Sequence, residues 1–172
     1  LPEPERAEVC APELAALIGH LLPRPVRATR SGWTLEGLSP AAAEFISQTA
    51  EQRLGARCEC FESSSATEST ARDTKLTLRG REVEAWLDDL GIAGTRPEDR
   101  SLPKAVERMP NGLLSLFLRH LCSATGAVRA AGRQRKGACV HFAMPSQVLA
   151  EGVAALLLRF GVVARIRRIE TE

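Results

Sequence analysis

The sequence predicts an α+β fold made of two related halves, residues 1–98 and 99–172. Two stretches, 12–22 and 113–122, carry apolar residues at positions i, i+3, i+4 and i+7, the spacing of a helix with one buried face. After each stretch the sequence indicates a hairpin, a second helix and a strand, in the same order. This succession predicts an approximate internal repeat, and its mixture of helices and short strands is an α+β arrangement.

The first helix is expected over residues 12–22. Pro12 suits its first turn, where the missing N–H costs nothing, and Pro23 stops the helix. Ala15 and Gly19 lie four residues apart on a neighbouring face, and two small residues so placed let another helix backbone approach closely. We therefore expect this helix to be buried on two sides. Its apolar face consists of Leu14, Leu17, Ile18 and Leu21.

Several further elements are expected before the second long helix. A glycine turn separates a helix from a strand in the stretch RLGARCEC, and Gly91 closes a later helix. A polar, low-complexity segment between them is typical of a loop. In order, these elements are a helix over 40–54, a strand within 53–60, a loop over 62–73, a strand over 75–79, a helix over 80–91 and a linker over 92–103.

The second half begins with the helix over 113–122, which Asn111 is expected to cap and Gly126 to end. A basic hairpin loop is predicted over about 127–143, a helix over about 146–159 and a strand within 159–169. The apolar face of the first of these helices consists of Leu114, Phe117, Leu118 and Leu121.

Composition places the chain among globular proteins, with 44% hydrophobic and 26% charged residues. No apolar run approaches the roughly 18–20 residues that span a membrane. The first residues are acidic and do not resemble a secretion signal. The five cysteines are an odd number within stretches expected to be core, which favours a reducing cytoplasm over a disulfide framework. We therefore expect a cytoplasmic monomer with buried cysteines.

Charge is distributed unevenly, although the formal net charge is only +2. Acidic residues gather at the start of the chain, and two basic clusters lie in the second half. Such clusters are typical of surfaces that contact nucleic acid, and they are also common on solvated loops. The clusters are Arg129, Arg133, Arg135 and Lys136, and then Arg159, Arg165, Arg167 and Arg168.

Two motifs resemble those of a known family. The stretches LIGHLLPRP (17–25) and LFLRHLCSATG (116–126) are similar to the paired motifs of LAGLIDADG homing endonucleases of intein type. Three further blocks resemble the segments between and after these motifs, especially in inteins carried by replicative DNA helicases. The blocks are VEAWLDDLGI (83–92), RSLPKAVERMPN (100–111) and VLAEGVAALLLRFGVVARIRR (148–168). The resemblance covers residues 12–169 and is most specific in the second half.

The resemblance implies two pseudo-symmetric halves packed on two central motif helices. In the family each of these helices ends in an acid that helps to hold a divalent metal, Mg²⁺ in active relatives, beside the scissile phosphates. Curved sheets from both halves lie along the major groove of duplex DNA. Double-stranded DNA is therefore the expected partner.

Both expected acids are replaced in this sequence. Arg24 stands at the first position, within Pro23-Arg24-Pro25, and Thr125 stands at the second. A guanidinium repels Mg²⁺, and a threonine hydroxyl is at best a weak neutral ligand. Glu36 and Glu151 are the nearest acids downstream of the two positions. We therefore expect no retained catalytic residue, no bound metal and no cofactor.

The expected function is duplex DNA binding by a catalytically inactive domain derived from an intein. The residues expected to contact DNA are Arg24, Arg27, Arg30, Arg129, Arg133, Arg135, Lys136, Arg165 and Arg167. Two alternatives remain open. One is an active metal-dependent endonuclease that uses substitute acids, and the other is a non-catalytic interaction or linker domain.

Two histidines and two tryptophans are expected to have structural rather than functional roles. His20 and His120 lie within the motif helices and are expected to be packed or hydrogen-bonded there rather than to bind metal. Trp33 and Trp86 are expected in the core.

Overall fold

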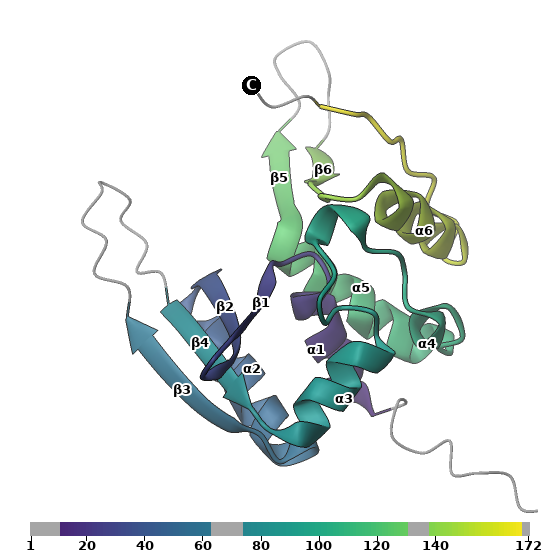
Figure 1. The fold of residues 1–172 in the computed structure, drawn as a ribbon. Coiled ribbons are helices and arrows are strands. Elements are labelled where there is room, and N and C mark those ends of the chain that lie inside the picture. The colour runs from purple at the N-terminus through teal and green to yellow at the C-terminus, as the bar shows by residue number, and fades with distance from the viewer. Residues whose placement is uncertain (1–10, 63–73, 131–137, 170–172) are drawn as a thin grey trace, which may run out of the picture. The chain divides into compact units, whose positions relative to one another are not determined.

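The computed structural model describes residues 11–62, 74–130 and 138–169, with only the backbone at 127–130, 138 and 139 (Figure 1). The chain forms two compact units. One unit combines the residues up to Pro23 with those from Pro97 onward, and the other spans Arg24–Arg96. The expected halves, 1–98 and 99–172, remain a prediction about sequence repeats. By contact, however, the first helix belongs with the second half.

The Arg24–Arg96 unit is an antiparallel sheet with the strand order β1-β2-β4-β3, joined by two helices (Figure 1). Helix α2 lies against one face of this sheet, where the Cys58 thiol donates a hydrogen bond to the carbonyl of Ser47 at 3.6 Å. The elements are β1 (Val26–Thr29), β2 (Gly32–Leu38), α2 (Pro40–Leu54), β3 (Arg57–Glu62), β4 (Thr74–Arg79) and α3 (Arg81–Asp89).

Local sequence explains the limits of α2. The Ser39 hydroxyl accepts a hydrogen bond from the amide of Ala42 at 3.3 Å, and Pro40 follows at the first helical position. Gly55 ends the helix in the left-handed conformation at φ 56°, which a glycine adopts without steric cost. The predicted helix over 40–54, the glycine turn and the strand after it are all confirmed.

The core of this unit lies between α2 and the sheet. Leu35, Leu76 and Leu78 alternate onto one sheet face and are almost completely buried. Ile46 of α2 is also fully buried. The strand predicted over 75–79 is confirmed as β4.

The other unit is built mainly of helices, with one two-stranded sheet. Its sheet pairs β5 with β6 in antiparallel fashion. The elements are α1 (Pro12–Leu21), the 3₁₀ turn Pro97–Asp99, α4 (Lys104–Glu107), α5 (Asn111–Thr125), β5 (Gly126–Ala130), β6 (Ala138–Phe142) and α6 (Gln147–Leu158). Among the described residues, none of these helices is long and apolar enough to cross a membrane.

Helices α1 and α5 pack directly on each other at Gly19. A β-carbon added at Gly19 would lie 2.6 Å from the carbonyl oxygen of Phe117 and 2.9 Å from the amide nitrogen of Leu121. Both of these atoms are backbone, so no side-chain movement makes room. Ala15 and Leu17 are fully buried as well. The expectation that small residues let a second helix approach α1 is confirmed.

A buried arginine holds the end of α1. The Arg100 side chain is 1% exposed and donates hydrogen bonds to the carbonyls of Leu21 at 3.3 Å and Leu22 at 2.9 Å. These carbonyls have no partner within the helix, and a cation is favoured at this end of the helix dipole. The Arg100 carbonyl in turn accepts a bond from the hydroxyl of Ser146 at 2.7 Å, and that hydroxyl caps α6. The predicted linker thus contains a central structural residue.

A second arginine connects the end of α6 to the start of α5. Arg159 donates to the carbonyls of Glu107 and Met109 and, at 2.6 Å, to the Asn111 side-chain oxygen. The prediction that Asn111 caps α5 is wrong, because Asn111 is the first helical residue and its side chain binds Arg159 instead.

Three other expectations are corrected. The segment 162–169 has no regular secondary structure, because a strand requires a hydrogen-bonded neighbour and none lies beside it among the described residues. Trp33 and Trp86 are half-buried rather than core. Cys60 is exposed, because it lies on an edge strand, while Cys58 and Cys122 are half-buried.

Replacing Gly19 with valine should destabilise the chain. Overpacking against backbone costs about 1–3 kcal/mol, and urea unfolding measures the loss. Gly112→Ala on α5 is the matched control, because nothing lies within 4 Å of its added β-carbon. The control should gain up to about 1 kcal/mol from helix propensity. Equal stability of Gly19→Val and the unmodified chain would show that α1 and α5 do not pack this closely.

Replacing Arg100 with methionine should lower the free energy of unfolding by about 3 kcal/mol, because two buried carbonyls lose a charged donor. Arg108→Met, at an exposed arginine, should change it by less than about 0.5 kcal/mol. Chemical denaturation of both variants provides the comparison. Similar small effects would contradict the role of Arg100 at the end of α1.

Candidate nucleic-acid interface

Arg24 follows the end of α1 and binds within its own unit. Its Nη1 donates a hydrogen bond to the carbonyl oxygen of Gly37 at 3.0 Å. Gly37 lies in an irregular stretch of β2, between Leu35 and Leu38, where the pairing with β4 shifts register. Burial lowers the pKa of the Arg24 guanidinium, which nevertheless stays protonated near neutral pH. This side chain supplies a cation and a donor at the first motif position.

Thr125 is the last residue of α5 and is half-buried. Its hydroxyl donates to the carbonyl of Leu121 at 2.9 Å, which is a bond within the helix. The hydroxyl carries no charge and its proton is already engaged. A guanidinium and a hydroxyl do not fit a hard dication that prefers anionic oxygen.

Other acids do not assemble into a replacement site within the described ranges. No group of three or more His, Cys, Asp or Glu side chains there could hold a metal ion together. Glu36 forms an ion pair with Lys75 at 3.1 Å, and Glu151 accepts a bond from Gln147 at 2.8 Å. The two nearest acids in the sequence therefore have other partners.

The two motif histidines meet where α1 and α5 pack. His20 Nε2 and His120 Nδ1 lie 3.0 Å apart, and the rings meet edge to face with centroids 5.0 Å apart. One of these two nitrogens must carry the proton and the other must accept it. Burial, and to a smaller extent the nearby Arg119, lowers the pKa of His120. The expectation that both histidines are packed and hydrogen-bonded is confirmed.

The sheet of the Arg24–Arg96 unit has one face that α2 does not cover. The strand register places on this open face the side chains that alternate with the buried leucines. Arg27 on β1 lies there opposite Thr34, which in turn lies opposite Thr77. The Thr34 and Thr77 hydroxyls are 3.4 Å apart, and both residues are buried, so the centre of this face is not exposed to solvent. The cations of this face are Arg27, Arg57, Lys75 and Arg79.

Acidic residues balance part of this charge. Arg79 pairs with Glu59 at 3.0 Å, and Lys75 pairs with Glu36. Each of these side chains is about half exposed, so salt and water screen the pairs strongly. Both cations can exchange a carboxylate for a phosphate at little cost. Arg27 and Arg57 are exposed cations on the same face.

Only some of the basic residues of the second half lie within the described part of the chain. Arg129 lies on β5, with backbone pairing to Cys139 on β6. Arg133, Arg135 and Lys136 lie outside the described residues. Arg165 and Arg167 are exposed, but they are not on a strand. The strand expected within 159–169 is therefore absent where these two arginines lie.

Sequence reasoning missed three cations of the first half. Arg57, Lys75 and Arg79 were not among the expected DNA contacts, although Arg27 and Arg30 were. Arg30 is exposed at the turn between β1 and β2. The signal was present in KLTLR, because its alternation puts Lys75 and Arg79 on the face opposite the leucines.

A comparison with protein families supports the resemblance for the last third of the chain. Residues 113–172 match a family described as a LAGLIDADG-like domain. This segment contains α5 from its third residue onward, the β5–β6 hairpin and α6.

Related sequences occur in replicative DNA helicases. Over 87 residues, or 51% of this chain, the identity is 34% to replicative DNA helicase DnaB of Nostoc sp. and 32% to that of Synechocystis sp.. The protein of the same name from Rhodothermus marinus is 32% identical over the same length. The matched segment covers only about a tenth of each helicase, 9–10%. The relatives thus bear the name of the class of helicase that the sequence resemblance indicated.

Stability should fall when the pH drops below about 6.5. The pKa of His120 is lowered from its usual 6.5 in the folded chain, so the unfolded chain takes up a proton first. The contribution of neutral His120 to the free energy of unfolding is fully present above pH 6.5. It is lost as the pH falls toward the lower pKa of the folded chain. Unfolding free energies at about pH 7.5 and 5.5 measure this slope.

His120→Gln should flatten that slope, because glutamine keeps a hydrogen-bonding group but does not titrate. His141→Gln is the control, because His141 is an exposed histidine on β6 and its loss should leave the slope unchanged. The same slope in His120→Gln and in the unmodified chain would contradict the interpretation.

Proposed function

We propose that this chain, whose residues 113–172 form a LAGLIDADG-like domain, is a duplex DNA-binding domain of intein type that does not cleave DNA. The observation that carries the proposal is the pair of residues at the two acid positions. Arg24 binds the Gly37 carbonyl and Thr125 binds the Leu121 carbonyl, so each has a role within the folded chain.

The lack of cleavage follows from electrostatics. Phosphodiester hydrolysis in this family depends on metal ions that polarise the phosphate and activate water. Binding such ions requires anionic oxygen at the ends of the motif helices. Arg24 contributes a positive charge instead, which raises the cost of placing a dication nearby. The proposal is therefore that the nuclease scaffold persists without its metal site.

Retained DNA binding is supported by the open face of the sheet in the Arg24–Arg96 unit. Four cations lie on this face, and cationic side chains contact the phosphates of DNA. The β5–β6 hairpin carries Arg129 and leads into the cluster Arg133, Arg135 and Lys136. These two surfaces are the proposed contacts with the duplex, in a chain that we expect to be monomeric and cytoplasmic.

An active endonuclease is the second candidate, and Glu36 and Glu59 are the acids that keep it open. Both lie on the open face of the sheet, but each forms an ion pair with a lysine or arginine of that face. A third candidate, an interaction or linker domain, is favoured by the small net charge of +2. It predicts neither DNA binding nor cleavage.

The proposal predicts salt-sensitive binding without cleavage. The substrate is duplex DNA that carries the insertion site in an intein-free host gene, with and without Mg²⁺ or Mn²⁺. A gel shift over a salt series measures binding, and denaturing electrophoresis of the same samples measures cleavage. Each neutralised phosphate should contribute about −0.9 to the slope of log K against log salt.

The charge-removing variant Arg27→Gln should reduce that slope by about 1, whereas Arg108→Gln, at an exposed arginine of the other unit, should leave it unchanged. Metal-dependent cutting of the duplex would contradict the proposed inactivity. Absence of any binding would favour the interaction or linker domain instead.

A further inference from the structure

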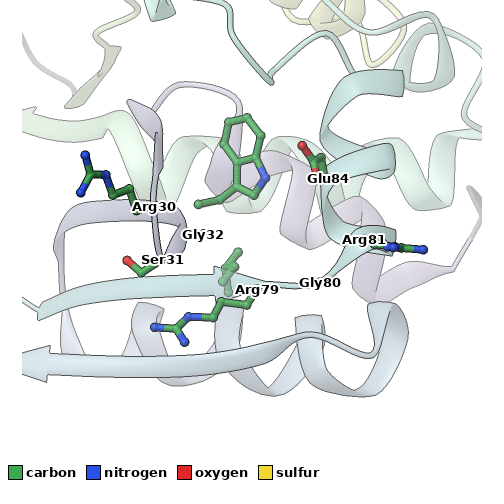
Figure 2. A pocket seen from close by; sticks show the side chains of 9 residues that line it. Arg30, Ser31, Gly32, Arg79, Gly80, Arg81 and Glu84 are labelled. Carbon is green, nitrogen blue, oxygen red and sulfur yellow. The ribbon is translucent and has the colours of Figure 1, made fainter.

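An open depression of about 390 Å³ lies in the Arg24–Arg96 unit, where the β1–β2 turn meets the junction of β4 and α3 (Figure 2). It is distinct from the two acid positions. Arg30 and Ser31 lie on its β1–β2 side, and Arg81 and Glu84 lie on its α3 side. The full lining is Arg30, Ser31, Gly32, Trp33, Leu78, Arg79, Gly80, Arg81 and Glu84.

The lining carries an excess of positive charge. Three arginines surround the depression, and Glu84 is its one carboxylate. Arg79 is partly neutralised by Glu59. Arg30 and Arg81 are exposed and form no ion pair within the described part of the chain. Two guanidinium groups at the rim are therefore available to an anion, and a guanidinium suits the oxygens of a phosphate.

The backbone holds the two arginine-bearing segments close together. Gly32 has φ 126°, and any β-carbon at this position would clash with the carbonyl oxygen of Leu78. The turn that carries Arg30 is thus packed against the end of β4. The Ser31 hydroxyl lies at this turn and is 3.1 Å from the Thr29 hydroxyl. The backbone of these segments is therefore held in place, whereas the Arg30 and Arg81 side chains point outward in Figure 2 and must turn inward to bind an anion.

Trp33 supplies an indole wall that the sequence assigned to the core. Its side chain is half-buried and lines the depression together with Leu78. The combination of cations and an apolar wall suits a phosphate that is attached to a sugar. It also places a natural fluorophore in the site.

We propose that this depression binds a phosphate group, and that it holds a backbone phosphate when the chain is bound to duplex DNA. The contact with a DNA phosphate rests on the proposed function, whereas phosphate binding by the depression does not. Glu84 opposes the anion, so its removal strengthens binding, whereas removal of Arg30 or Arg81 weakens it.

Fluorescence of Trp33 tests the phosphate site without DNA. The chain contains two tryptophans, so Trp86→Phe leaves Trp33 as the sole emitter. The ratio of quenching by iodide, which is anionic, to quenching by neutral acrylamide should be higher for Trp33 than for free N-acetyltryptophanamide. Inorganic phosphate should compete with iodide at constant ionic strength, set with chloride, and should leave acrylamide quenching unchanged.

Variants in the Trp86→Phe background locate the effect. Competition by phosphate should weaken at least fivefold in Arg30→Gln/Arg81→Gln and become stronger in Glu84→Gln. Arg108→Gln should behave as the parent does, and circular dichroism checks that each variant is folded. Phosphate that competes no better than chloride, or competition that survives in the double variant, would overturn the site.

Binding to duplex DNA tests whether the depression holds a backbone phosphate. In the salt series, Arg30→Gln/Arg81→Gln should reduce the slope of log K against log salt by about 1 to 2. An unchanged slope in a chain that binds the duplex would overturn the assignment to a backbone phosphate. If no variant binds the duplex, the proposed function fails, and the quenching measurement still decides whether the depression binds phosphate.

Discussion

The close contact of α1 with α5 at Gly19 is the constraint on which the helical unit depends. Because a β-carbon there would meet the Phe117 carbonyl at 2.6 Å, the two helix axes can approach only where a glycine stands. This approach brings His20 within hydrogen-bond distance of His120. It also joins a helix from the start of the chain to residues that lie about a hundred positions later, which explains why α1 belongs to the same compact unit as α5. The packing is independent of any acid at the helix ends.

Three arginines that bind backbone carbonyls help to hold this scaffold together. Arg100 satisfies the last carbonyls of α1 and connects through Ser146 to α6, while Arg159 joins the end of α6 to the start of α5. At the first acid position, Arg24 binds a carbonyl in the irregular part of β2. Removal of Arg100 would leave buried carbonyls without partners, which is more costly than the loss of an exposed charge. None of these contacts involves an acid at the end of α1 or α5, which supports the proposal that the fold persists without cleavage.

Patterns of neighbouring residues predicted the helix ends and the strand that depend only on nearby sequence. Gly55 and Gly126 end their helices as expected, and the alternation in KLTLR predicted the strand β4. The remaining features depend on contacts between distant residues. Arg100 was hidden in an apparent linker because its partners are 78 and 79 positions away. Asn111 was expected to cap α5, but its side-chain oxygen accepts a hydrogen bond from Arg159 instead. The strand expected within 159–169 had suitable residues, but no neighbouring strand to pair with among those described. Trp33 was expected in the core, yet it lines an open depression.

The central claim is that the ends of α1 and α5 no longer form a metal site. The most direct measurement is a Mn²⁺ titration of the ¹⁵N-labelled chain bound to duplex DNA, followed by paramagnetic broadening of its amide signals. Our account predicts no broadening centred on Leu22 and Thr125 beyond the weak general effect of Mn²⁺ along the DNA phosphates. Saturable broadening of these two amides, ahead of other amides near the DNA, would show that a divalent ion still binds between the helix ends and would contradict the account.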